Sequence, residues 1–184
     1  MYFKKLIVLF CGLFLLFACA DKSKNDGSNK RSEATYIQSI DSLEKVLYAK
    51  TDKGIDRSAA LATIGAYAGI VKDYPSTKLA AEYLFKAGEI SSSLNYSTEA
   101  IGYFKAAYDN YPDFNKASYC LFLQAFIYEN QLHQLGEAAH LYNEVIKKFP
   151  NEKIAQDAQA CLNNLGKTDE ELIKEFDAKN KKSS

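Results

Sequence analysis

Residues 84–112, LFKAGEISSSLNYSTEAIGYFKAAYDNYP, contain two helical patterns separated by the turn-forming residues 94–97, LNYS. Small residues stand where two helices would have to approach closely, and bulky residues stand where the space between them must be filled. Pro112 ends the second pattern, because proline lacks a backbone donor and clashes with the preceding helical turn. The stretch therefore predicts a pair of packed helices.

The same unit recurs on both sides of this stretch. Pro75, Pro112 and Pro150 each follow an aromatic residue and stand 37 and 38 residues apart, a spacing typical of a helical solenoid. Apolar residues also recur at helical spacing over residues 32–50, 55–74 and 152–165, and residues 168–171 form a capping box that opens a last helix. We therefore expect an all-α, right-handed α-solenoid of about three and a half helix pairs with a C-terminal capping helix over residues 33–179.

The chain resembles the tetratricopeptide repeat family, whose pattern sets bulky, small and aromatic residues and a proline at fixed offsets. Departures from that pattern include Ser91, which replaces a tyrosine, Val145, which stands where a small residue is usual, and a first unit that matches poorly. The resemblance implies that the residues packing the repeats are Leu84, Gly88, Ala100, Phe104, Ala107 and Pro112, followed in the next unit by Leu121, Ala125, Tyr128, Ala138, Tyr142 and Pro150.

The linkers between units are long, with nine residues from Pro75 to Leu84 and from Pro112 to Leu121. In this they resemble the repeats of bacterial envelope proteins, notably the repeat lipoprotein of the outer-membrane β-barrel assembly machine and the periplasmic coordinator of the Tol-Pal cell-division system. A likeness of fold does not by itself transfer a role.

The N-terminus is typical of an exported protein. Lys4 and Lys5 precede an apolar run at residues 6–20, which suits a signal peptide better than a membrane span. Residues 16–19, LFAC, resemble a bacterial lipobox, which implies a signal peptide at 1–18 and lipidation at Cys19. The alternative is a plain signal peptide or an anchor helix that contains cysteines. The polar residues 19–32 predict a flexible tether, and residues 180–184 a disordered tail.

Little in the sequence favours catalysis. Lys and Arg number 23, as do Asp and Glu, which gives no basis for a nucleic-acid surface, and no phosphate loop or paired-cysteine metal motif occurs. We expect no enzyme activity, no cofactor and no metal; His133 and His140, with Glu137 as the nearest acid, are better explained as surface residues. Cys120 and Cys161 are expected to be free thiols, with a disulfide between them as the open alternative.

The resemblance also implies that the first helix of each pair lines a groove for a partner. The residues expected in this groove are Phe85, Glu89, Tyr119, Phe122, Phe126 and Glu129. Aromatic side chains bury a large area at low entropic cost, so such a groove suits an apolar or amphipathic peptide. Capture of a C-terminal carboxylate is disfavoured, because the Lys and Asn that the family uses for it are missing. The alternative is that these aromatics are core, covered by the last helix through Leu172 and Phe176.

Together these features predict a membrane-anchored protein-interaction scaffold of the bacterial cell envelope, on the outer membrane and facing the periplasm. Inner-membrane or surface exposure stays open, as do the partner and the oligomeric state. The alternatives are an accessory in outer-membrane protein assembly and a periplasmic module that binds a ligand or the cell wall.

Overall fold

All regular secondary structure in the described part of the chain is helical, and that part contains no strand. The structure, a computed structural model, describes residues 30–49 and 54–182. Its helices are α1 (Glu33–Leu47), α2 (Arg57–Asp73), α3 (Ala80–Ser93), α4 (Ser97–Asn110), α5 (Ala117–Asn130), α6 (Leu135–Lys148), α7 (Lys153–Asn164) and α8 (Asp169–Lys182). The predicted signal peptide, Cys19, most of the predicted tether and residues 183–184 lie outside the described residues, and α8 extends into the predicted tail.

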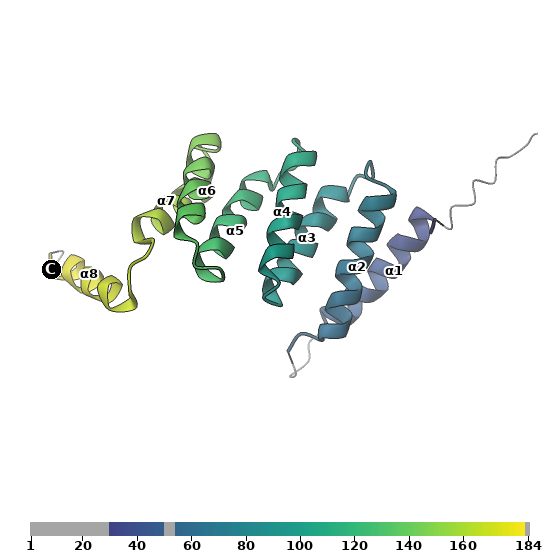
Figure 1. The fold of residues 1–184 in the computed structure, drawn as a ribbon, viewed down its shortest axis with the longest axis horizontal. Helices are drawn as coiled ribbons and strands as arrows, with labels where there is room; N and C mark the ends of the chain where they lie inside the picture. The colour runs from purple at the N-terminus through teal and green to yellow at the C-terminus, as the bar shows by residue number, and fades with distance from the viewer. Residues whose placement is uncertain (1–29, 50–53, 183–184) are drawn as a thin grey trace, which may run out of the picture.

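The helices stack in chain order. From α1 to α7 each helix packs against the next, and α5 also contacts α7. Figure 1 shows the resulting row of helix pairs, α1 with α2, α3 with α4 and α5 with α6, followed by α7 alone. This confirms the predicted all-α helical repeat solenoid and its three full pairs.

The close approach of α3 and α4 depends on one glycine. A methyl group added at Gly88 would lie 2.7 to 2.9 Å from three ring atoms of Phe104, which is 1% exposed and packs edge-on against Phe85. The packing residues predicted from the repeat pattern lie in the core: Leu84, Gly88, Ala100, Phe104, Ala107, Leu121, Ala125, Ala138 and Tyr142. Tyr128 is half-buried, and Pro112 and Pro150 stand exposed where helices end.

The linkers between units repeat one backbone structure. After α2, the amide of Thr77 donates to the carbonyl of Tyr74 at 3.0 Å, and the amide of Ala80 donates to that of Thr77 at 3.1 Å. The same two bonds recur at residues 111, 114 and 117 and at residues 149, 152 and 155. The hydroxyl of Tyr111 also donates to the carbonyl of Pro75 at 2.9 Å and so ties the second linker to the first. The nine-residue spacing in the sequence is therefore a folded connection of fixed shape.

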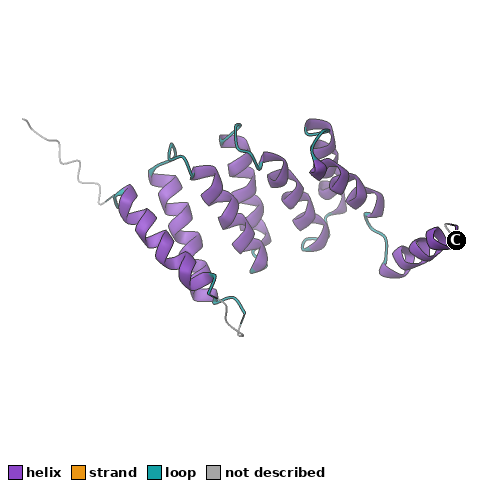
Figure 2. Ribbon diagram, turned by 180° about the vertical axis from the view of Figure 1, so that it is seen from behind, coloured by secondary structure: helices purple, strands orange, loops and turns teal. Residues whose placement is uncertain are grey.

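The stack ends at α7. Its inner side buries Ile154, Ala155 and Ala158, whereas Gln156 and Gln159 are exposed on the outer side. A polar outer side is what the terminal helix of a solenoid needs, because no further unit covers it. The capping role expected of the last helix is thus filled by α7, and α8 lies beyond the stack in both views (Figures 1 and 2).

The capping box predicted at the start of α8 is present. The amide of Thr168 donates to the Glu171 carboxylate at 2.9 Å, and the amide of Glu171 donates to the Thr168 hydroxyl at 3.3 Å. Ile173, on the first turns of this helix, is 62% exposed.

Candidate functional site

Four large side chains on α5 form what we call the α5 face: Tyr119, Phe122, Leu123 and Phe126. They recur at three- and four-residue spacing and therefore lie on one side of the helix. Tyr119 is 44% exposed and Phe126 is 42% exposed, while Phe122 and Leu123 are half-buried. The Phe122 ring lies 5.5 Å from the ring of Tyr142, which fixes its orientation from below. Two exposed aromatics thus stand on a rigid, packed base.

Phe85 does not belong to this exposed surface. It was expected in the groove, but it is 5% exposed and makes edge contacts with Phe104 at 5.5 Å and Phe114 at 5.9 Å. Phe114 comes from the linker before α5, and Lys116 from the same linker lies 4.7 Å from the centre of the Phe85 ring. The linker therefore covers Phe85 and makes it part of the core.

The last helix does not fill the groove. The alternative interpretation required α8 to fold back over α3 and α5 through Leu172 and Phe176. Instead α8 projects away past α7, at the far end of the molecule (Figures 1 and 2). The side chain of Phe176 lies outside the described part of the structure. The exposure of Tyr119 and Phe126 is consistent with this arrangement.

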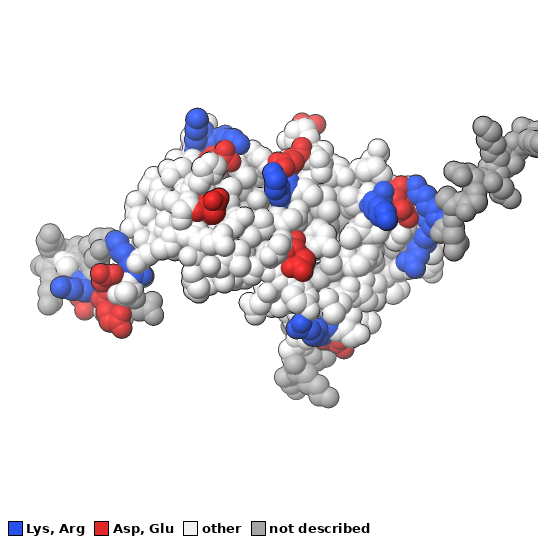
Figure 3. All heavy atoms as spheres, viewed as in Figure 1, with Lys and Arg blue, Asp and Glu red and all other residues white. Residues whose placement is uncertain are grey.

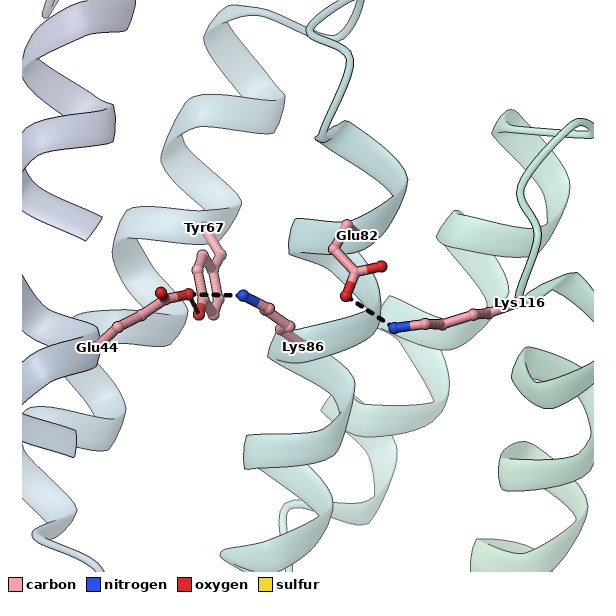
Figure 4. A network of polar contacts seen from close by, with 5 residues as sticks. All are labelled: Glu44, Tyr67, Glu82, Lys86 and Lys116. Atoms are coloured by element: carbon pink, nitrogen blue, oxygen red, sulfur yellow. Dashed lines mark hydrogen bonds and ion pairs between the residues drawn. The ribbon is translucent and has the colours of Figure 1, made fainter. Parts of the chain in front are cut away.

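Charged side chains join the first helices of successive units (Figure 4). Lys86 on α3 forms an ion pair with Glu44 on α1 at 2.8 Å, and Tyr67 on α2 donates to the same carboxylate. Lys116, just before α5, pairs with Glu82 on α3 at 2.8 Å. These contacts link three units through their side chains, and both lysines, Lys86 and Lys116, are paired with a carboxylate.

The network changes the protonation of its members. Burial acts to raise the pKa of Glu44, but hydrogen bonds from Lys86 and Tyr67 outweigh it and hold that pKa below its usual value. Burial likewise acts to lower the pKa of Lys86, but the bond to Glu44 reverses this and raises it. The pair is therefore fully ionised at neutral pH.

Two further polar contacts join α5 to α6 and to the start of α7. The hydroxyl of Tyr142, on α6, donates to the half-buried carboxylate of Glu129 at 2.7 Å, and Ser118 donates to Glu152 at the start of α7 at 2.5 Å. Glu129, predicted as a partner-binding residue, thus also anchors α6. Glu89, the other predicted acid, is exposed on α3.

The histidines and cysteines considered in the sequence do not form a catalytic or metal-binding cluster among the described residues. His133 adopts a left-handed backbone conformation in the turn between α5 and α6, as Asn95 does one unit earlier, and His140 is exposed on α6. Across residues 30–49 and 54–182 no group of three or more His, Cys, Asp or Glu is arranged to hold a metal ion. Cys120 and Cys161 are free thiols, and burial raises the pKa of Cys120 to about 12, so that this thiol stays protonated.

Residues 119–152, from the first exposed aromatic of α5 to the start of α7, match a family model described as a tetratricopeptide repeat. The chain contains a tetratricopeptide repeat. Such repeats bind proteins, and the match indicates a protein-interaction scaffold. No curated protein matches the chain.

Charges of both signs lie on one face of the molecule. On the face drawn in Figure 3, Lys and Arg are interspersed with Asp and Glu and form no single-sign patch among the described residues. No described helix is long and apolar enough to cross a membrane.

Sequence reasoning missed the contacts of Lys116 and the repeat place of Asp157. Lys116 covers Phe85 and pairs with Glu82, although it stands in a linker. Asp157, on α7, stands 38 residues after Tyr119, the spacing that separates Pro112 from Pro150. That spacing gives Asp157 on α7 the same repeat place as Tyr119 on α5.

Proposed function

We propose that this protein is a lipid-anchored interaction scaffold of the bacterial cell envelope, which binds a peptide or partner protein through the α5 face. The observation that supports it best is the exposure of Tyr119 and Phe126 on a helix whose opposite side is locked into the stack. Preorganised aromatic side chains bind partners well, because little side-chain freedom remains to be lost.

The α5 face is tested by site-specific photocrosslinking in cells. A photoreactive amino acid replaces Phe126 in one variant and Glu137, an exposed residue of α6, in the control. We expect a discrete crosslinked partner at position 126 and none at position 137, with mass spectrometry identifying the partner. Equal labelling at both positions, or none at 126, would contradict binding at this face.

The membrane anchor is a separate part of the proposal and rests on the lipobox-like residues 16–19. Several acyl chains, each gaining about 0.8 kcal/mol per buried methylene, hold a protein on a membrane almost irreversibly. Cys19→Ala is therefore expected to move the protein from the membrane fraction to the soluble fraction. Unchanged membrane association of this variant would refute lipidation at Cys19.

A role as an accessory in outer-membrane protein assembly is a second candidate. It is favoured by the long linkers, whose repeated turn structure keeps the units at a fixed spacing. Copurification of the native protein with barrel-assembly proteins would support this role. Saturable binding of a cell-wall glycan without any protein partner would instead favour a ligand-binding module.

A further inference from the structure

The repeat spacing assigns matching groove places to α3, α5 and α7. Equivalent places lie 37 residues apart between α3 and α5, and 38 residues apart between α5 and α7. Glu82, Tyr119 and Asp157 are therefore equivalent, and so are Glu89 and Phe126. The groove places are Glu82, Phe85, Lys86 and Glu89 on α3, the four residues of the α5 face, and Asp157, Ala160, Cys161 and Asn164 on α7. The helices that carry the last two sets, α5 and α7, are also in contact.

The basic side chains of this surface are already occupied. Lys86 is the only cation among the groove places, and its ammonium lies 2.8 Å from the Glu44 carboxylate. Lys116, which borders the groove, lies 2.8 Å from Glu82. An acidic ligand would therefore have to break an existing ion pair, at the cost of leaving its carboxylate partner uncompensated.

Two acids at groove places, Glu89 on α3 and Asp157 on α7, have no ion-pair partner among the described residues. Within residues 30–49 and 54–182, Glu129 has only the neutral Tyr142 hydroxyl. Glu89 is exposed on α3. Desolvation by the surrounding protein raises the pKa of its carboxyl, and the positive charges of Lys116 and Lys86 offset this rise only in part. The groove thus has unpaired negative charge next to exposed aromatic rings.

We propose that the α5 face binds a cationic segment of a partner protein, in which Lys or Arg flank an apolar or aromatic side chain. The apolar residue packs on Tyr119, Phe122 and Phe126, while the flanking cations pair with Glu89 on one side and Asp157 on the other. The exposed rings also attract cations directly, as the Phe85 ring attracts Lys116 at 4.7 Å. This inference rests on the proposed function, because it specifies the partner of the same face.

The test uses the full chain, purified in nonionic detergent, and three fluorescent peptides of one length. All three have Leu and Phe at fixed positions and differ only in having Lys, Gln or Glu at the positions between them. Each exposed ion pair contributes about 0.2–1 kcal/mol, so two pairs predict binding of the Lys peptide about 2- to 30-fold tighter than the Gln peptide. The Glu peptide is expected to bind most weakly.

Variants assign the preference to particular carboxylates. Glu89→Gln with Asp157→Asn should bring the affinity for the Lys peptide close to that for the Gln peptide. Glu137→Gln, which removes an exposed acid from α6, is the matched control and should change neither affinity. Raising the salt concentration should weaken only the Lys peptide.

The outcomes separate this inference from the proposed function. If the three peptides bind equally and Phe126→Ala abolishes their binding, the charge preference is wrong and the α5 face still binds partners. If no peptide binds, even after the C-terminal lysines named below are replaced, or if Phe126→Ala has no effect, both are contradicted. If the Lys peptide binds only after Lys179, Lys181 and Lys182 are replaced by Gln, the chain's own C-terminus occupies the face and the inference of a partner segment is overturned.

Discussion

Adding one methyl group at Gly88 should destabilise the protein, although alanine is the better helix former. The added methyl would lie 2.7 to 2.9 Å from Phe104, closer than carbon atoms approach without one of them moving. Phe104 has little room to move, because it is 1% exposed and packs against Phe85 with ring centres 5.5 Å apart. Overpacking of this kind costs about 1–3 kcal/mol.

The helix propensity of alanine offsets about 1 kcal/mol of this cost. The net expectation for Gly88→Ala is a loss of up to about 2 kcal/mol, which corresponds to a fall in melting temperature of up to roughly 8 °C for a domain of this size. Gly102, on α4 of the same unit, is exposed, and a methyl group there would meet no atom within 4 Å. Gly102→Ala should therefore stabilise the protein by about 0.5–1 kcal/mol.

Thermal and urea unfolding of the two variants, followed by circular dichroism, measures both effects. The opposite signs are the essential result, since the two substitutions are chemically identical and differ only in what the methyl group meets. Stabilisation by Gly88→Ala equal to that by Gly102→Ala would refute the close approach of α3 and α4.

Two further predictions concern the polar contacts. Tyr142→Phe removes the hydrogen bond to Glu129 and should lower the free energy of unfolding by about 1.5–3 kcal/mol. Tyr119→Phe, on the exposed surface, is the control and should change the free energy of unfolding little. Equal effects of the two substitutions in urea titrations would argue against the contact between Tyr142 and Glu129. The pKa of Glu44 is lower in the folded protein than in the unfolded chain. The stability that this difference contributes is fully present above the pKa of an unfolded glutamate, about 4.3, and is lost as the pH falls through the pKa of the folded state. Glu44→Gln should therefore destabilise the protein at pH 7 and converge with the wild type in acid, and a constant difference in unfolding free energy across this range would show that the ion pair contributes nothing.

The helical packing was predictable because it depends on the spacing of small and large residues that are close in the sequence. Gly88 and Phe104 are a small and a large residue on facing helices, and the recurring prolines mark where each pair ends. The capping box at Thr168 was also predictable, since its hydrogen bonds join residues that are three apart in the sequence. Repetition at 37 and 38 residues then extends the local pattern along the stack.

The site was only partly predictable, because its exposure depends on contacts between distant residues. Phe85 and Phe122 occupy equivalent places in the pattern, but a linker phenylalanine, Phe114, covers only the first. The pairing of Lys86 with Glu44 joins residues 42 apart in different units, and no local rule indicates it. Where α8 points is likewise set by the linker after α7 and not by the helix's own pattern.

The central claim is that the aromatics of α5 form an open binding face and not core, and Phe122→Ala combined with Phe126→Ala tests it most directly. Stability and crosslinking to the partner are measured on the same protein, with Phe104→Ala as the buried reference. Truncation of the fully buried Phe104 should cost about 3–5 kcal/mol, and the double variant should cost clearly less while losing the partner. A loss of stability in the double variant as large as that of Phe104→Ala, with the partner still bound, would contradict the account.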